Sequence, residues 1–277
     1  MLQAGNQNGI LREGEEQMDK KLRKKFFNGK FSFGSWITFT STASAEIMAK
    51  AGFNWLAIDM EHSPISIERA QELIQVIELS GTIPLVRLSS NDPVQIKRIM
   101  DAGAYGIIVP NVSSSEDVLA AIRATKYPPI GSRGVGLARA QGYGASFEDY
   151  KSKINANSIV IVQIENKDAV DNIEDILTVR GLNGVIIGPY DLSGSYGVTG
   201  QLKHPKVRAA EKRVLEAAKK LKIPAGTHIV FPDAKELRRR IELGYRLVAF
   251  GVDMIFLLKE CQGAIGAIKA AGHRSGR

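Results

Sequence analysis

The chain has 277 residues with 37 basic and 29 acidic side chains, a formal net charge of +8, and 44% of its residues are hydrophobic. This composition is that of an ordinary globular protein, and it excludes extended disorder and coiled-coil architecture. The longest apolar runs fall far short of the roughly 20 residues that a helix needs to cross a bilayer, so we expect no membrane partner. The length admits either two average domains or one α/β barrel of about 250 residues.

The basic excess is concentrated in two stretches, 20–25 and 238–240. A nucleic-acid surface needs basic side chains on one face with aromatic or polar readers among them, and the sequence does not fix that arrangement. We interpret the charge as solvated helix faces and expect no nucleic-acid partner. Because the single cysteine, Cys261, cannot form an internal disulfide, the sequence fits a reducing compartment and favours a cytoplasmic enzyme.

The first 25 residues differ in character from the rest of the chain. They form a polar and basic tail, and residues 1–17 lack the apolar region of a signal peptide. We predict disorder over 1–25, with Met18 a candidate initiator, and a single domain over 26–277.

From residue 31 onward, short apolar or β-branched runs alternate with amphipathic helical stretches, as a parallel sheet with helical crossovers requires. The helical stretches include 66–80, 93–102, 205–221 and 233–243. The eight predicted strands are 34–39, 55–61, 83–88, 106–112, 159–165, 185–189, 225–229 and 248–252. Eight β/α units in one series predict an α/β fold, a single (β/α)8 TIM barrel. The alternative, a doubly wound open sheet, usually has a glycine-rich phosphate turn after its first strand, where Ser41-Thr42-Ala43 stands here.

Two further segments stand out. The stretch 127–157, after the fourth β/α unit, is a long loop with a short predicted helix near 147–153, and loops of this length are often functional. It either covers the site or reaches a neighbouring subunit, and its Arg133 and Arg139 are candidates for an interface or for a substrate tail. The apolar C-terminal helix at 254–271 predicts packing on a neighbour, and hence a homo-oligomer.

Active sites of such barrels gather at the carboxyl ends of the strands. Charged groups at the ends of apolar strands are costly to desolvate unless they bind a metal, a ligand or each other. The candidates are Asp59, Glu61 and His62 after the second strand, Arg87 on the third, Gln163 and Glu165 on the fifth, and Gly188, Pro189, Tyr190 and Asp191 after the sixth.

Glu165 and Asp191 close successive strands, so their carboxylates can converge on one point. Hard oxygen ligands suit Mg²⁺ or Mn²⁺, with Co²⁺ a further candidate, better than zinc. Two protein ligands leave positions open for a chelating 2-oxo acid, and a metal there would polarise the ketone and stabilise an enolate.

Several motifs, taken together, resemble one family. They are Gly-Phe-Asn-Trp-Leu-Ala-Ile-Asp-Met-Glu-His at 52–62, Val-Arg at 86–87, Tyr-Pro-Pro-Ile-Gly-Ser-Arg-Gly at 127–134, Gln-Ile-Glu at 163–165 and Gly-Pro-Tyr-Asp-Leu-Ser at 188–193. In order and spacing, from about residue 34 to 258, the chain resembles the HpcH/HpaI aldolases, the class II pyruvate aldolases related to 2,4-dihydroxyhept-2-ene-1,7-dioate aldolase.

The resemblance implies a metal-dependent, reversible retro-aldol cleavage of a 4-hydroxy-2-oxo acid to pyruvate and an aldehyde. It implies that Glu165 and Asp191 are metal ligands, that Arg87 holds the enolate oxygen, and that His62, paired with Asp59, transfers a proton. The implied substrate-binding set is Gln163, Gly188, Pro189, Tyr190 and Asp191, with the amides around the last two receiving the pyruvate carboxylate. A trimer or hexamer is the implied assembly.

Alternatives remain at this point. Met60 stands where glycine is common in the family, and Leu88-Ser89 where proline often follows the arginine, which leaves the aldehyde specificity open. The same superfamily contains citrate-lyase-like enzymes that act on coenzyme A thioesters, and a non-catalytic metabolite-binding barrel is a third reading. His228, at the end of the seventh strand, is a weaker pocket candidate. An imine mechanism through Lys97 or Lys167 is disfavoured because both belong to predicted helices.

Overall fold

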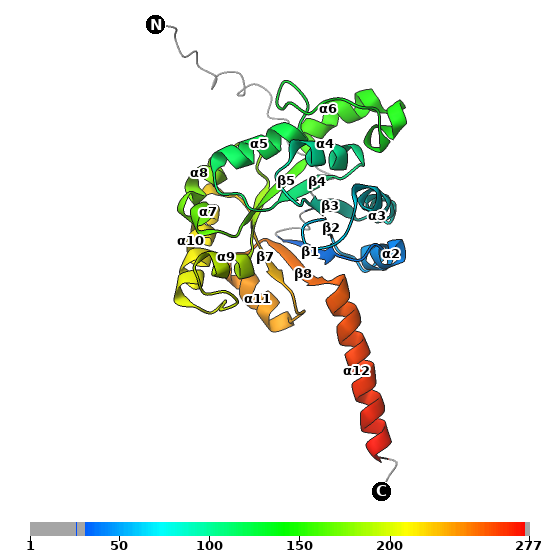
Figure 1. The fold of residues 1–277 in the computed structure, drawn as a ribbon, viewed down its shortest axis with the longest axis vertical. Helices are drawn as coiled ribbons and strands as arrows, with labels where there is room; N and C mark the ends of the chain where they lie inside the picture. The colour runs from blue at the N-terminus through cyan, green and yellow to red at the C-terminus, as the bar shows by residue number, and fades with distance from the viewer. Residues whose placement is uncertain (1–25, 27–30, 275–277) are drawn as a thin grey trace.

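The computed structural model describes Phe26 and residues 31–274, so the tail predicted at 1–25 lies outside the described residues. Eight parallel strands close into a barrel in chain order, which confirms the predicted fold class (Figure 1). The strands are β1 (Ser32–Ile37), β2 (Trp55–Asp59), β3 (Ile83–Arg87), β4 (Gly106–Val109), β5 (Ile159–Ile164), β6 (Gly184–Ile187), β7 (Ala225–Ile229) and β8 (Leu247–Val252).

Helices surround the barrel, and one long helix, α12, extends away from it (Figure 1). They are α2 (Thr42–Lys50), α3 (Ile67–Leu79), α4 (Pro93–Asp101), α5 (Ser115–Thr125), the 3₁₀ helix η1 (Arg139–Gly144), α6 (Phe147–Asn157), α7 (Lys167–Asp171), α8 (Ile173–Thr178), α9 (Pro189–Ser195), α10 (Pro205–Leu221), α11 (Ala234–Leu243) and α12 (Asp253–Arg274).

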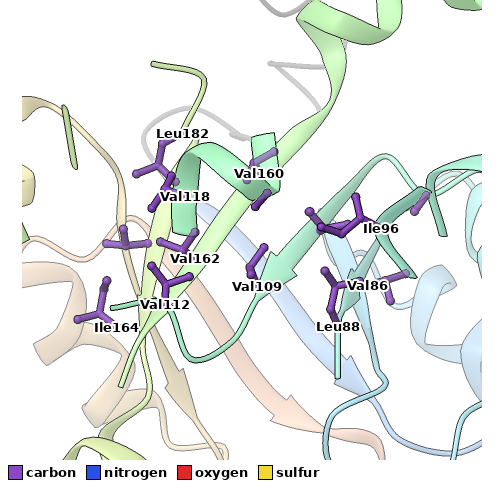
Figure 2. Close-up of a cluster of buried hydrophobic side chains, with 14 of the residues drawn as sticks. Val86, Leu88, Ile96, Val109, Val112, Val118, Val160, Val162, Ile164 and Leu182 are labelled. Atoms are coloured by element: carbon purple, nitrogen blue, oxygen red, sulfur yellow. The ribbon is translucent and has the colours of Figure 1, made fainter. Parts of the chain in front are cut away.

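The strands are apolar on both faces because both faces are covered. Every residue of β5 is buried, as is usual for a strand in a parallel barrel. One cluster of side chains, including Trp55 and Ile161, fills the interior, and a second lies between the strands and the helices. Figure 2 shows part of the second cluster, where Val86 of β3 and Val162 of β5 lie among helix side chains.

Helix caps shape the loops at the carboxyl end of the barrel. Each capping side chain accepts a hydrogen bond from a main-chain N–H of the helix's first turn, which satisfies a group with no partner inside the helix. Such caps follow six strands: Ser41 on α2, Ser66 on α3, Asp92 on α4, Ser114 on α5, Asn166 on α7 and Asp233 on α11. These short loops therefore have defined geometry and can position polar side chains.

The long segment between α5 and β5 lies at the opposite end of the barrel. Arg133 is buried and its Nη2 is 2.5 Å from Oδ1 of Asp101, the last residue of α4. Arg139 pairs with Glu78 in the last turn of α3. Because these helices run antiparallel to the strands, their carboxyl ends mark the amino-terminal end of the barrel. The expectation that this segment covers the site, or that these arginines hold a substrate tail in it, is therefore wrong within one subunit.

The C-terminal helix α12 projects from the carboxyl end of β8 with little of its surface covered (Figure 1). Its apolar side chains Leu257, Ile265 and Ile268 are 57%, 52% and 66% exposed. Within the described range, no helix has the length and apolar character that a membrane span requires.

Candidate active site

Asp59 and Arg87 form a pair at the carboxyl ends of adjacent strands. They are direct neighbours in the β2–β3 register, and both side chains are largely buried. Arg87 donates from Nη2 to Asp59 Oδ2 at 2.6 Å and from Nε to Oδ1 at 2.9 Å, a bidentate bond that fixes the guanidinium plane. Burial raises the pKa of Asp59, but Arg87 and two main-chain amides outweigh it, so the net pKa is lowered.

Arg87 also reaches the other side of the barrel. Its Nη1 donates to Oε1 of Gln163 at 3.3 Å, and its guanidinium carbon lies 4.5 Å from the ring centre of Trp36. Gln163 in turn donates from Nε2 to Oε2 of Glu165. Arg87 is therefore connected through Gln163 to Glu165, the candidate metal ligand directly after β5.

His62 contacts Asp59 through its main chain. The amides of Glu61 and His62 donate to Asp59 Oδ1 at 3.0 and 3.2 Å, whereas the imidazole is 62% exposed and its Nε2 is 3.9 Å from Oε2 of Glu61. The imidazole therefore does not pair with the Asp59 carboxylate as expected, because Arg87 binds both carboxylate oxygens. Asp59 instead accepts from the main-chain amides of the turn that follows it. The imidazole lies at the rim, where solvent or substrate can exchange protons with it.

Glu61 belongs to the site although the motif analysis gave it no role. Its Oε2 is buried and 3.2 Å from Nη1 of Arg87, in a direction that makes no hydrogen bond. Burial raises the pKa of Glu61 to about 7; Arg87 opposes that shift, while the nearby carboxylates, chiefly Glu165, add to it. Its place one residue before His62 was the available sequence signal.

Glu165 and Asp191 both face Gly188. Glu165 is 3% exposed and accepts from the amide of Asn111 at 2.6 Å, whereas Asp191 lies exposed in the first turn of α9. A Cβ at Gly188 would lie 2.8 Å from Glu165 Oε2 and 3.8 Å from Asp191 Oδ2, so the missing side chain leaves the space between the carboxylates open. Burial is the largest cause that raises the pKa of Glu165, and the charge of Asp191 adds to it.

These two carboxylates suit a divalent cation. A buried carboxylate that faces a second one is stabilised in its charged form by a cation between them. Among the described residues, no three His, Cys, Asp or Glu side chains gather closely enough to hold a metal by themselves. An ion here would have two protein ligands, and water or substrate would complete its coordination.

The start of α9 lies beside this pair. Pro189, Tyr190 and Asp191 form its first turn, in which main-chain N–H groups have no partner inside the helix. An anionic group next to the carboxylate pair would find donors there. Lys97 and Lys167, by contrast, are exposed on α4 and α7.

His228 of β7 also lies at this end of the barrel. Its ring centre is 5.8 Å from that of Trp36, and its Nε2 is 3.2 Å from the carbonyl oxygen of Gly251. Burial is the main cause that lowers the pKa of His228 to about 4; the charge of Arg87 also lowers it. The indole N–H of Trp36 is buried with no acceptor among the described residues.

Comparison of the sequence with known proteins identifies the family that it resembles. The model of the family HpcH/HpaI aldolase/citrate lyase matches residues 32–259. The chain is 39% identical over 248 residues to the 4-hydroxy-2-oxo-heptane-1,7-dioate aldolase of Escherichia coli, a match that covers 88% of this chain and 93% of the relative.

Two solved structures share the fold. An HpcH/HpaI aldolase/citrate lyase family protein from Burkholderia cenocepacia J2315 superposes with a TM-score of 0.85 at 33% identity, covering 91% of this chain and all of that one. The citrate synthase SbnG superposes with a TM-score of 0.81 at 25% identity, covering 93% of this chain and 100% of that chain. Relatives of this barrel therefore carry names that imply different substrates.

Proposed function

The chain belongs to the HpcH/HpaI aldolase/citrate lyase family, and we propose that it is a class II pyruvate aldolase that cleaves a 4-hydroxy-2-oxo acid to pyruvate and an aldehyde. The observation that carries the proposal is the pair Glu165 and Asp191 facing Gly188, with Arg87 linked to Glu165 through Gln163. The names of its relatives support the same reaction class, a carbon–carbon lyase.

Glu165 and Asp191 would hold the divalent ion on which aldolases of this family depend, Mg²⁺ or Mn²⁺ and also Co²⁺. Bound there, the ion would polarise the ketone of the substrate and stabilise the pyruvate enolate. The first-turn amides around Tyr190 and Asp191 would receive the pyruvate carboxylate, and Gln163 would help to orient the 2-oxo acid.

Side chains of the protein would transfer the proton and donate a hydrogen bond to the enolate oxygen. A base removes the proton of the 4-hydroxyl, the C3–C4 bond breaks as the aldehyde carbonyl forms, and the bonding electrons pass into the enolate. His62 at the rim is the group that we assign to this proton. Arg87, held in place by Asp59, would donate a hydrogen bond to the enolate oxygen, a position where preorganised donors contribute most to catalysis.

The test is pyruvate release from a panel of 4-hydroxy-2-oxo acids with Mg²⁺, Mn²⁺ or Co²⁺ added to chelator-treated protein. We expect release only with metal, and loss of metal binding in Glu165→Gln and Asp191→Asn. Activity that survives exhaustive chelation, or inactivation by borohydride in the presence of pyruvate, would contradict the metal mechanism. Cleavage of a coenzyme A thioester without pyruvate would favour the citrate-lyase-like alternative.

Two further assignments belong to this proposal. We place the enzyme in the cytoplasm, which its one cysteine, the exposed Cys261, supports. We also propose a homo-oligomer, a trimer or hexamer, in which the exposed apolar side of α12 packs on a neighbouring subunit.

A further inference from the structure

The segments that lead directly from a strand end to the next helix contain no lysine or arginine. The stretches between strand ends and the following helices are 38–41, 60–66, 88–92, 110–114, 165–166, 188 and 230–233, and none contains either residue. Three exposed lysines lie around these segments: Lys167 begins α7, Lys203 precedes α10, and Lys259 on α12 donates to the Pro232 carbonyl oxygen at 3.4 Å. Arg87, at the end of β3, is engaged with Asp59, Glu61 and Gln163. A second carboxylate on the substrate would therefore find no unengaged cation in these segments.

The carboxylates of the site make an anionic tail still less favourable. Even with a divalent ion between Glu165 and Asp191, the four carboxylates Asp59, Glu61, Glu165 and Asp191 together with Arg87 leave no net positive charge at this end of the barrel. Like charges brought together in a partly desolvated site repel, and such repulsion is a common way to exclude a competing substrate.

His228 adds a hydrogen-bond acceptor to the same region. Its Nε2 faces the Gly251 carbonyl oxygen, which can only accept, so Nε2 carries the proton and Nδ1 presents a lone pair. The lowered pKa keeps the ring neutral near pH 7. Among the described residues Nδ1 has no partner. A lone pair attracts a hydroxyl hydrogen and repels a carboxylate oxygen.

The indole N–H of Trp36 is the complementary group. It is a buried donor without an acceptor among the described residues, and the Trp36 ring lies beside the ring of His228 and under the guanidinium of Arg87. Buried polar groups without a protein partner are uncommon and often bind a ligand or an ordered water. A donor on one ring and an acceptor on the next match hydroxyl groups, which donate and accept.

Resting on the proposed function, we propose that His228 and Trp36 select 4-hydroxy-2-oxo acids whose aldehyde half carries neutral hydroxyl groups in place of a second carboxylate. The preferred aldehyde is then a small hydroxyaldehyde. This differs from the relative whose name specifies a dioate, with a carboxylate at each end.

The experiment compares three substrates of the metal-loaded full chain. They are 4,5,6-trihydroxy-2-oxohexanoate, 4-hydroxy-2-oxohexanoate and 4-hydroxy-2-oxoheptane-1,7-dioate, which share the pyruvate half and differ in the tail. We expect kcat/KM for the trihydroxy acid to exceed that for the monohydroxy acid by about 10-fold, the effect of one neutral hydrogen bond, and the dioate to be the poorest.

Variants test whether these residues carry the preference. His228→Leu and Trp36→Phe should each bring the ratio of the two hexanoates close to one, and His228→Gln, which keeps an acceptor oxygen, should restore part of it. Because the ratio divides out general damage, a purely structural role would not move it. The matched control is His204→Leu, a histidine that caps α10, and its ratio should equal that of the wild type.

The outcomes separate the two proposals. If pyruvate protons exchange with solvent but the dioate is preferred, or the ratio is unchanged in His228→Leu, this inference alone is overturned. If no substrate is cleaved and pyruvate protons do not exchange, the proposed function fails and this inference fails with it.

Discussion

Arg87 links the groups of the candidate site to one another. One guanidinium binds Asp59 in a bidentate pair, donates to Gln163, and lies over the ring of Trp36. These contacts remove its rotational freedom before any substrate arrives. Such preorganisation is what allows a donor to stabilise charge that develops only in the transition state.

Arg87→Lys should slow both aldol cleavage and pyruvate proton exchange. A lysine carries the charge without the planar fork, so it cannot bind both oxygens of Asp59 and also point at the enolate. The expected loss is ~2 to 4 kcal/mol of barrier, the usual effect of removing an oxyanion donor. Proton exchange followed by NMR in D₂O measures it, with Arg139→Lys, at the opposite end of the barrel, as the control. An unchanged exchange rate in Arg87→Lys would remove Arg87 from the mechanism.

His62→Ala should damage cleavage far more than metal binding. The imidazole makes no contact with the carboxylate pair, and the bonds to Asp59 come from the main chain, so the substitution leaves the rest of the site in place. Loss of general acid–base catalysis lowers rates by ~10² to 10⁴. Turnover and Mn²⁺ affinity are measured on the same samples. Equal losses in both would make His62 a structural residue or a ligand.

His228 should make the free energy of unfolding depend on pH below neutrality. Its pKa is lowered in the folded state to about 4, so the unfolded chain binds the proton more tightly and stability falls as the pH falls from 6.5 toward 4. From pH 7 to pH 5 this group should remove about 2 kcal/mol of stability. Urea unfolding of metal-free protein at both pH values should show that His228→Leu loses that much less than the wild type. If both proteins lost the same free energy of unfolding between pH 7 and pH 5, His228 would be solvated and its pKa would not be lowered by burial.

At this scale the sequence located the candidate residues but not their partners. Asp59, Arg87, Glu165 and Asp191 were found because strand ends in a barrel share one rim. Glu61 received no role, since its shifted pKa arises from burial beside charges on other strands. Arg133 and Arg139 were misplaced because their partners, Asp101 and Glu78, lie on helices distant in the sequence.

At the scale of elements, all eight strands were predicted. The first and fourth strands end earlier than predicted, in each case because of a polar contact made by the residues that follow. The first strand was expected at 34–39 but ends at Ile37, because the amides of Thr38 and Phe39 donate to Asp253. The fourth was expected to reach residue 112 but ends at Val109. Asn111 takes a positive φ of 54° and donates its amide to Glu165. Apolar periodicity does not detect such polar contacts.

The junction of β6 and α9 depends on Gly188. An added Cβ would lie 2.8 Å from Oε2 and 3.0 Å from Cβ of Glu165, closer than side chains approach each other. Gly188→Ala should therefore displace Glu165 and weaken metal binding at least 10-fold while the barrel remains folded. Calorimetric titration with Mn²⁺ measures the affinity, and circular dichroism checks the fold. The control is Gly194→Ala within α9, where an added Cβ has its nearest neighbour at 3.7 Å. Unchanged affinity in Gly188→Ala would place the metal elsewhere.

At the scale of the whole molecule, the barrel lacks the cover that a helix after the last strand usually provides. α12 extends away from the barrel, α11 buries none of its residues, and Ile47 on α2 is 71% exposed (Figure 1). On α12, Met254, Leu258, Cys261, Ile265 and Ile268 recur at alternating spacings of four and three, so they lie along one side. An exposed stripe of this kind is typical of a helix that packs on another subunit.

Ile265→Lys should therefore dissociate the protein. A lysine in the middle of the stripe would have to be desolvated at the subunit contact, whereas an isolated helix would tolerate it. Sedimentation velocity at micromolar concentration should show a trimer or hexamer for the wild type and smaller species for the variant. Ala267→Lys adds the same charge two residues further on, about 200° around the helix, and should leave the assembly intact. A wild-type monomer, or equal behaviour of the two variants, would mean that α12 does not hold the subunits together.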